Sequence, residues 1–252
     1  MKLKYYIIIV SLLFGCGQAD FKTKQAHFNT TQIDSALQSD AQIDNSIAPY
    51  KLELDDKMNE IIGFASDEFN NAAGETGEST LGDFVADLLL EQTRTVYSDT
   101  LHMAVINHRG GLRTPIRKGD IKVSNVYELM PFDNEMWVLE ISGDLVQQLF
   151  NNAAQRKSNC IAGAKYTILN NETATAITIN GKAFDPKKIY TVSISDYLAG
   201  GGGGHSFLKS ITPIFDPDYK CRDMIIDFIK ATSKVKGDTL VPKIDGRVKM
   251  WQ

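Results

Sequence analysis

The sequence predicts an α/β fold of the α+β kind, with a mixed sheet flanked by helices. Short apolar runs rich in β-branched residues, typical of strands, are interspersed with segments whose apolar residues recur at helical spacing. The two kinds of segment follow no strict strand–helix–strand rhythm, which argues against a doubly wound parallel sheet. The composition is that of a globular protein, because 43% of the 252 residues are hydrophobic and 23% are charged. One core of about 150–200 residues fits this length.

The N-terminal residues 1–15 are predicted to be a signal peptide. Two lysines give a positive start, and residues 5–14 form an almost unbroken apolar run. The run is about half the roughly 20 residues that a membrane-spanning helix requires. Gly15-Cys16 resembles the cleavage site of bacterial lipoproteins, whose cysteine is acylated. We therefore expect lipidation of Cys16 and a protein anchored in the cell envelope, on the periplasmic or outer face of a membrane. An ordinary signal peptide and an uncleaved anchor are the alternatives.

Residues 16–47 are predicted to be a tether, and residues 48–252 to be the folded domain. The tether is rich in Gln, Asn, Asp, Ser and Thr, with few apolar residues at any steady spacing. From Ala48 the pattern changes, and a short helix that runs up to Gly63 is predicted from apolar residues that share one face. These residues are Leu52, Leu54, Met58, Ile61 and Ile62.

The next predicted helix follows Ser79, which is a candidate N-cap. Its apolar residues recur at helical spacing, and they are Leu81, Phe84, Val85, Leu88 and Leu89. Residues 101–106 form a short apolar run that predicts a strand. This run ends in a glycine-containing turn at residues 107–111.

The rest of the domain continues with strands and helices in mixed order. A helix is predicted from a cap at Ser124 to Leu129, and Pro131 ends it. Alternating residues at 136–141 predict a strand, and Ser142 begins another helix. Further strands are predicted at 165–169, 176–179 and 189–194, a turn at Asn180-Gly181, and a late amphipathic helix around 224–229.

The charge and the cysteines exclude some partners and leave others open. The net charge of −4 provides no basic surplus, so no nucleic-acid partner is expected. With Cys16 assigned to the lipid, Cys160 and Cys221 remain. Two buried free thiols are the default expectation, and an exported compartment leaves a disulfide as the alternative.

Three segments place glycines and polar groups directly after apolar runs, where backbone can approach a ligand. Residues 78–83 begin a helix, residues 107–113 place Arg113 after two glycines, and residues 196–205 place Tyr197 beside five glycines. Such an arginine can bind a carboxylate, a phosphate or a purine edge, and such a tyrosine can stack on a flat ring. Taken singly, the three segments are explained as well by a helix start, a solvated turn and a flexible loop.

Taken together and in order, five segments resemble the motifs of one family, the C-terminal domain of the 5′-nucleotidases. They are residues 78–87 (E-S-N-L-G-N-L-x-A-D in the family), 110–113 (G-G-[IL]-R), 127–134 (L-P-F-x-N), 192–204 (D-[YF]-L-A-x-G-G-D-G) and 245–247 (E-G-R). The resemblance covers about residues 50–252 and implies a substrate-binding domain.

The resemblance also implies roles for individual residues. Phe132 and Tyr197 would hold the base between two aromatic rings, and Arg113 would bind substrate oxygens. Stacking contributes about 1–3 kcal/mol per ring, so two rings could anchor a nucleoside. The other residues expected in this nucleotide site are Asn107, His108, Gly201 and Gly202.

The sequence departs from the family pattern within these segments. Gly203 stands where the family has an Asp that holds the ribose hydroxyls, which removes hydrogen bonds worth about 1.5–3 kcal/mol each. His108 stands where the glycine turn usually has Asn, with Asn107 one residue earlier. Residues 73–83 contain no basic residue, although an Arg often precedes this helix in the family. These differences predict an altered pocket with weaker nucleoside recognition.

Hydrolysis in this family belongs to an N-terminal metallophosphoesterase domain, which binds two metals through motifs such as D-x-H, G-N-H-[DE] and G-H-x-H. The four histidines of the chain lie in none of these motifs, and they are His27, His102, His108 and His205. Asp196 and His205 alone offer too few ligands for an ion. We therefore expect no catalytic residue, no metal site and no cofactor in this chain.

Three functions remain open on the sequence. The first is a membrane-anchored nucleotide-binding domain that acts with a separately encoded metallophosphoesterase, with the residues around 52–62 marking the docking side. The second is a stand-alone 5′-nucleotidase or phosphatase, against which the missing metal motifs argue. The third is a lipoprotein that binds another flat or anionic ligand, which the change at Gly203 favours.

Overall fold

A computed structural model describes residues 30–34, 37–233 and 239–252 of the chain. The predicted signal peptide, the lipidation site Cys16 and half of the predicted tether lie outside these residues. The second of two compact units comprises Pro49–Gln252 and contains all the strands of the described residues. No helix in the described ranges is both long enough and apolar enough to cross a membrane.

The first described helix, α2, runs from Ala41 to Met58 and corrects the predicted bounds of the helix before Gly63. It begins inside the stretch assigned to the tether, because the Asp40 carboxylate accepts the backbone N–H of Gln42 and thereby caps the helix start. It ends before Ile61 and Ile62, which belong to strand β1 (Ile61–Ala65) rather than to a helix. This strand pairs antiparallel with β3 (Gly119–Lys122), a partner that lies far away in the sequence.

The centre of the fold is a four-stranded sheet in the order β4-β9-β2-β5. Strands β2 (Met103–Asn107) and β9 (Ile189–Ser195) are parallel neighbours. Strands β4 (Met136–Ser142) and β5 (Asn159–Ala162) pair antiparallel at the two edges. The predicted mixed sheet is confirmed, and β5 is a strand that the sequence did not indicate.

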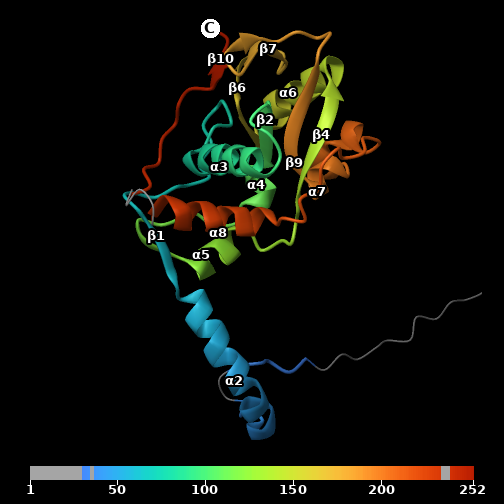
Figure 1. Cartoon of the computed structure of the whole chain (residues 1–252). Coiled ribbons are helices and arrows are strands. Elements are labelled where there is room, and N and C mark those ends of the chain that lie inside the picture. The colour runs from blue at the N-terminus through green and yellow to red at the C-terminus, as the bar shows by residue number, and fades with distance from the viewer. Residues whose placement is uncertain (1–29, 35–36, 234–238) are drawn as a thin grey trace, which may run out of the picture. The chain divides into compact units, whose positions relative to one another are not determined.

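Helices cover both faces of the central sheet (Figure 1). Ala104 and Ile106 of β2 pack with α3 (Thr80–Val96) and α8 (Cys221–Ala231), whereas Met103 and Val105 pack with α6 (Gly143–Arg156). This alternation follows from the period of two in a strand, which sends successive side chains to opposite faces. Ser79 and Ser142 cap α3 and α6 as predicted, each accepting a backbone N–H of the first turn.

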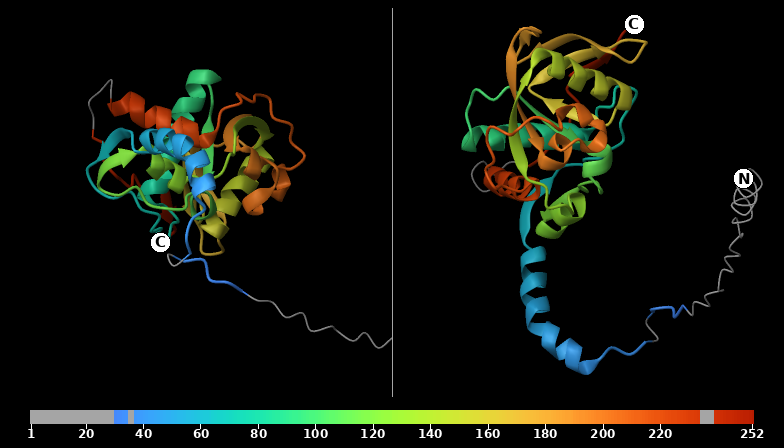
Figure 2. Two further views of the ribbon diagram at one scale, coloured as in Figure 1. Left: turned by 90° about the horizontal axis from the view of Figure 1, so that it is seen from below. Right: turned by 90° about the vertical axis from the view of Figure 1, so that its right-hand side faces the viewer.

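A second sheet has the order β10-β6-β7-β8. Its strands are β6 (Ala164–Ile168), β7 (Ala174–Ile179), β8 (Lys182–Ala183) and β10 (Val248–Met250). The predicted turn at Asn180-Gly181 joins β7 to β8, with both residues at positive φ. Strand β10 pairs parallel with β6, so the C-terminus lies beside this sheet (Figure 2).

The short helix α5 spans Val123–Leu129 and starts before the predicted cap at Ser124. Lys122 is the N-cap of α5, and Asn125 accepts its backbone N–H, so Ser124 lies inside the helix rather than at its cap. Cys160 and Cys221 are both free and buried, as the default expectation had them.

Candidate functional site

The segments around Arg113, Phe132 and Tyr197 meet at one end of the central sheet, whereas the candidate segment 78–83 lies elsewhere. β2 and β9 are parallel neighbours, so the residues that follow their carboxyl ends lie at the same edge. There they border a cavity of about 710 Å³, within the range of small-molecule sites. The cavity is lined by Ile106, Asn107, Gly110, Gly111, Arg113, Met130, Pro131, Phe132, Asp133, Asn134, Ser195, Tyr197, Leu198 and Cys221.

The end of β2 contributes Asn107 and Arg113. Asn107 is the N-cap of the single-turn helix α4 (His108–Gly111), because its Oδ1 accepts the Gly110 N–H at 2.9 Å. The Asn107 Nδ2 makes no hydrogen bond within the described part of the chain. Arg113 is exposed, and its backbone N–H donates to the Leu129 carbonyl at 2.8 Å. Among the described residues no carboxylate pairs with the Arg113 guanidinium, so this cation is available to a ligand.

Phe132 follows α5 in a loop that Arg222 of α8 holds in place. Phe132 is 42% exposed and lines the cavity. The buried Arg222 guanidinium donates to the carbonyls of Met130 and Phe132 at 3.4 and 3.3 Å, and to the Asp133 carboxylate. Its hydrogen bond and positive charge, together with the charge of Lys220, hold the pKa of Asp133 below its ordinary value. The loop that carries Phe132 is therefore fixed by a buried cation.

Tyr197 lies in the single-turn helix α7 (Asp196–Ala199), which follows β9. Tyr197 is 57% exposed and borders the cavity. A Cβ atom on Gly202 would lie 2.5 Å from two ring carbons, so the Gly202 backbone packs directly against the ring. The Gly203 N–H donates to the Tyr197 hydroxyl at 3.2 Å. The glycine loop thus supports the ring, and a larger residue at Gly202 does not fit there.

The two aromatic segments are connected to each other. Asn134 Nδ2 donates to Asp196 Oδ1 at 2.8 Å, and the same oxygen accepts the Tyr197 N–H at 2.6 Å. The Asp196 N–H also donates to the Glu135 carbonyl at 2.9 Å. Because each segment contributes one aromatic ring, these bonds fix the two rings in a common frame.

Some of the predicted site residues line the cavity and others do not. Asn107, Arg113, Phe132 and Tyr197 line the cavity. Gly201 and Gly202 do not line it; Gly202 supports the Tyr197 ring from behind.

His108 does not line the cavity and is fully buried. The turn of α4 directs its side chain inward, where a Cβ atom on Gly82 would lie 3.2 Å from the His108 Cβ. Burial, reinforced by the charge of Arg109, lowers the pKa of His108 to about 4, so the ring is neutral at ordinary pH. His108 therefore packs in the protein core, whereas a contact with the ligand was predicted for it.

Several lining residues were not predicted. Met130, Asp133 and Ser195 lie within the segments that resemble the family motifs, but no role was predicted for these three residues. Cys221 comes from the start of α8, and the positioning residue Arg222 follows it. Nothing in the sequence links this helix to the site, because the contact depends on packing between distant segments.

Gly203 lies close to the side chain of Asn107. Its φ is 57°, and a Cβ atom there would lie 2.9 Å from both the Asn107 Nδ2 and a Leu198 methyl group. A larger residue would have to displace the Asn107 amide. The region beside Gly203 therefore presents an amide N–H donor instead of a carboxylate.

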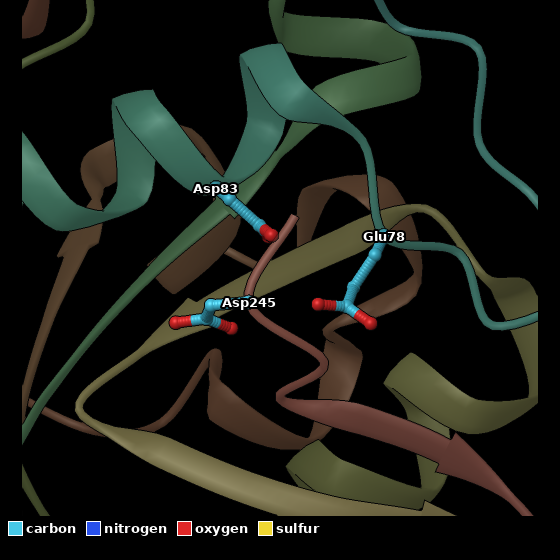
Figure 3. Close-up of side chains that lie close together, drawn as sticks. All are labelled: Glu78, Asp83 and Asp245. Carbon is cyan, nitrogen blue, oxygen red and sulfur yellow. The ribbon is translucent and has the colours of Figure 1, made fainter. Parts of the chain in front are cut away.

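A second polar cluster lies away from the cavity. Figure 3 shows the side chains of Glu78, Asp83 and Asp245 converging, and one carboxylate oxygen from each lies within 4.8 Å of the others. In the described ranges this is the only group of three or more His, Cys, Asp or Glu residues whose side chains lie close enough together to hold a metal ion.

Arg247 supplies the positive charge of this cluster. Its guanidinium is buried, binds both Asp87 oxygens at 2.9 and 2.7 Å and donates twice to Asp245 at 3.0 Å. Its backbone N–H donates to Glu78 Oε1 at 3.1 Å. The space between Glu78 and Asp245 is thus filled by N–H donors of the chain, and the cluster joins the start of α3 to β10.

Asp83 is the one member of the cluster without a hydrogen bond. It is 3% exposed, and the Arg247 Nε lies 3.7 Å from its Oδ1. Burial, together with the negative charge of Glu78 and its neighbours, raises the pKa of Asp83 to about 7, against the lowering effect of Arg247.

Comparison with known proteins identifies the same segments. The family model described as "5′-nucleotidase, C-terminal domain" matches residues 61–210. The trifunctional nucleotide phosphoesterase protein YfkN of Bacillus subtilis is 25% identical over 247 residues, which cover 90% of this chain and 16% of that protein. The NAD 5′-nucleotidase of Haemophilus influenzae is 27% identical over 231 residues, covering 77% of this chain and 36% of that protein.

Solved structures share the fold. The 5′-nucleotidase precursor of Thermus thermophilus superposes with a TM-score of 0.69 at 22% identity, over 82% of this chain and 43% of that one. A putative 5′-nucleotidase of Staphylococcus aureus superposes with a TM-score of 0.66 at 19% identity, over 87% of this chain and 46% of that one. The chain therefore spans less than half of the length of each of these four proteins.

Proposed function

Because the chain belongs to the 5′-nucleotidase C-terminal domain family, we propose that it binds a nucleotide or nucleoside between Phe132 and Tyr197. The observation that carries the proposal is a cavity bordered by two exposed aromatic rings and one unpaired cation. Each ring that stacks on a base contributes about 1–3 kcal/mol. The rings are held in a common frame before any ligand arrives, which reduces the ordering cost of binding.

Arg113 and Asn107 supply the polar contacts of the proposed site. The Arg113 guanidinium presents donors in a planar fork that matches phosphate oxygens. The free Asn107 Nδ2 adds a neutral donor next to Gly203. Both groups favour a ligand with oxygen acceptors near its aromatic ring, and a nucleotide phosphate supplies them.

We propose further that hydrolysis is carried out with a metallophosphoesterase encoded on a separate chain. Two metal ions are commonly used to hold the attacking and leaving oxygens in phosphate ester hydrolysis. Of the histidines in the described residues, His108 and His205 are fully buried, and the acidic cluster of Figure 3 already surrounds Arg247. A division of labour, with substrate binding in this domain and catalysis in the partner, gives a role to the aromatic cavity, from which these histidines and the acidic cluster lie apart.

Membrane attachment through Cys16 completes the proposal. An acyl group on this residue would keep the domain at the membrane surface of the cell envelope. One acyl chain gives only marginal binding, so stable anchoring requires more than one. Radiolabelled palmitate incorporated into the protein, and lost in Cys16→Ser, would support the anchor; an unlabelled protein would contradict it.

Ligand binding is tested by titration calorimetry of the full chain with AMP and with adenosine. We expect Tyr197→Ala and Phe132→Ala each to weaken binding at least tenfold, because each removes one stacking surface. Phe64→Ala is a matched control, since Phe64 is 45% exposed in β1 and does not line the cavity. Unchanged affinity in both ring variants would contradict the proposed site.

A second candidate function is binding of another flat, anionic ligand. The observation that favours it is the Asn107 amide at Gly203, which offers a donor where a ribose hydroxyl would be expected to find a carboxylate. A thermal-shift panel separates the two functions, because a ligand at 100 times its Kd stabilises the protein by about 2.7 kcal/mol. Stabilisation by a metabolite without a base, and by no nucleotide, would favour the second function.

A further inference from the structure

His205 is fully buried behind the glycine loop, which we define as Gly201–Gly204. Its Nδ1 lies 3.0 Å from the Gly202 carbonyl, and its backbone N–H donates to the same oxygen at 3.0 Å. Its Nε2 lies 3.2 Å from the Nδ2 of Asn159. Because the carbonyl can only accept and the amide can only donate, these contacts require a neutral ring with the proton on Nδ1.

The network extends from His205 to helix α6 and back to the loop. Asn159 Nδ2 also donates to the Asn152 Oδ1 at 3.1 Å, and Asn152 Nδ2 donates to the Gly204 carbonyl at 3.0 Å. The loop is therefore held at Gly202 by the buried His205 and at Gly204 by the half-buried Asn152. Within the loop, Gly202 packs against the Tyr197 ring and the Gly203 N–H donates to the Tyr197 hydroxyl.

We propose that His205 is a positioning residue, which holds the glycine loop and thereby the Tyr197 ring in the orientation that binds the ligand. The proposal includes a pH dependence, in which ligand binding weakens when the His205 ring becomes protonated. This inference rests on the proposed function, because it requires a ligand that contacts Tyr197.

Protonation of His205 breaks the network for a geometric reason. A proton on Nε2 would point at the Asn159 Nδ2, which is itself a donor. The Asn159 Oδ1, which has no hydrogen-bond partner in the described structure, can face the ring only if the amide turns over and releases Asn152. The glycine loop would then lose the link that Asn159 makes between His205 and Asn152 of α6.

The charged surroundings of His205 favour the neutral ring. Burial lowers the pKa of His205, and the positive charge of Arg156 in α6 lowers it further, while the backbone of Gly202 and Gly203 acts in the opposite direction. The Arg156 guanidinium lies against the loop, 2.9 Å from where a Cβ atom on Gly204 would be. The Phe207 ring, with its centroid 5.7 Å away, adds no charge. Weakening of binding is therefore expected only at pH values below the ordinary histidine range.

Two variants separate positioning from packing. His205→Phe keeps an aromatic ring and loses both side-chain hydrogen bonds. His205→Gln keeps a donor for Gly202 and an acceptor for Asn159, and it does not titrate. His102→Gln is the matched control, because His102 is partly buried, bonds to Thr191 and does not line the cavity.

The first measurement is hydrogen exchange of the backbone amides at residues 201–204 in the unliganded protein. We expect at least tenfold faster exchange in His205→Phe, and exchange close to wild type in His205→Gln and His102→Gln. Equal exchange in His205→Phe and wild type, with both folded, would overturn the positioning role. This readout does not depend on the identity of the ligand.

The second measurement is the Kd for AMP between pH 4.5 and 8. We expect about tenfold weaker binding in wild type at the acid end, a flat profile in His205→Gln, and weak binding at every pH in His205→Phe. A wild-type acid loss that His205→Gln retains would overturn the pH dependence. If wild type binds neither AMP nor adenosine, the proposed function and the pH dependence both fail, while the exchange measurement still decides the positioning role.

Discussion

The hydrogen bond from Asn134 Nδ2 to Asp196 Oδ1, 2.8 Å long, joins the loop of Phe132 to the helix of Tyr197. Asn134 is two residues after one ring, and Asp196 immediately precedes the other. A hydrogen bond to a charged acceptor contributes about 1.5–3 kcal/mol. The separation of the two rings thus depends on a polar contact outside the rings themselves.

Asn134→Asp tests this connection, because it places a carboxylate against the Asp196 carboxylate. We expect Kd for AMP to rise about tenfold and the free energy of unfolding to fall by about 1–3 kcal/mol. Calorimetry and urea unfolding provide the two values. Asn45→Asp in the exposed part of α2 serves as the control for an added negative charge. Wild-type affinity in Asn134→Asp would show that the rings are positioned independently.

Gly202→Ala tests the contact between the glycine loop and Tyr197. The added methyl group would lie 2.5 Å from the ring, so either the ring or the loop must move. We expect weaker AMP binding and a loss of about 1–3 kcal/mol, which is the usual cost of overpacking.

Gly74→Ala is the matched control for this substitution, since a Cβ atom at Gly74 meets nothing within 4 Å. Thermal unfolding and calorimetry of both variants make the comparison. Equal behaviour of Gly202→Ala and Gly74→Ala would contradict the close contact.

Asp83 predicts a pH dependence of stability. Its pKa is raised to about 7 in the folded protein, against an ordinary value near 4, so the folded state keeps a proton that the unfolded state releases. The free energy of unfolding should therefore fall as the pH rises from about 4 to about 7, by roughly 2–4 kcal/mol from this residue.

Asp83→Asn removes this titration, and its amide can donate to the surrounding carboxylates. We expect a variant that is more stable than wild type at pH 8, with a smaller difference at pH 4. Urea unfolding across this range measures both, with the exposed Asp99→Asn as control. A variant less stable than wild type at pH 8 would show that Asp83 is needed as a charged partner of Arg247.

Much of the fold was predictable because its signals are local. Ser79 and Ser142 cap helices as expected, since capping needs only the residues of the first turn. The motifs also pointed to three residues with predicted ligand contacts, which are Arg113, Phe132 and Tyr197. Arg113 and Tyr197 border one cavity because the strands before them, β2 and β9, are parallel neighbours, and the loop after α5 adds Phe132.

What the sequence did not predict depends on contacts between distant residues. Ile61 and Ile62 form a strand because β3, about sixty residues later, provides the pairing partner. The support of Phe132 by Arg222 comes from a helix 90 residues away. His108 lies in the core close to Gly82 of α3, a neighbour from a distant segment that the adjacent glycines do not indicate.

The most direct test of the central claim is phosphate release from AMP by the purified protein with excess divalent metal. The measurement is made on the full chain alone, and again with a metallophosphoesterase purified from the same cell envelope. We predict no release by the chain alone, release with the partner, and loss of the joint activity in Tyr197→Ala. Metal-dependent phosphate release by this chain alone would contradict the division of labour proposed here.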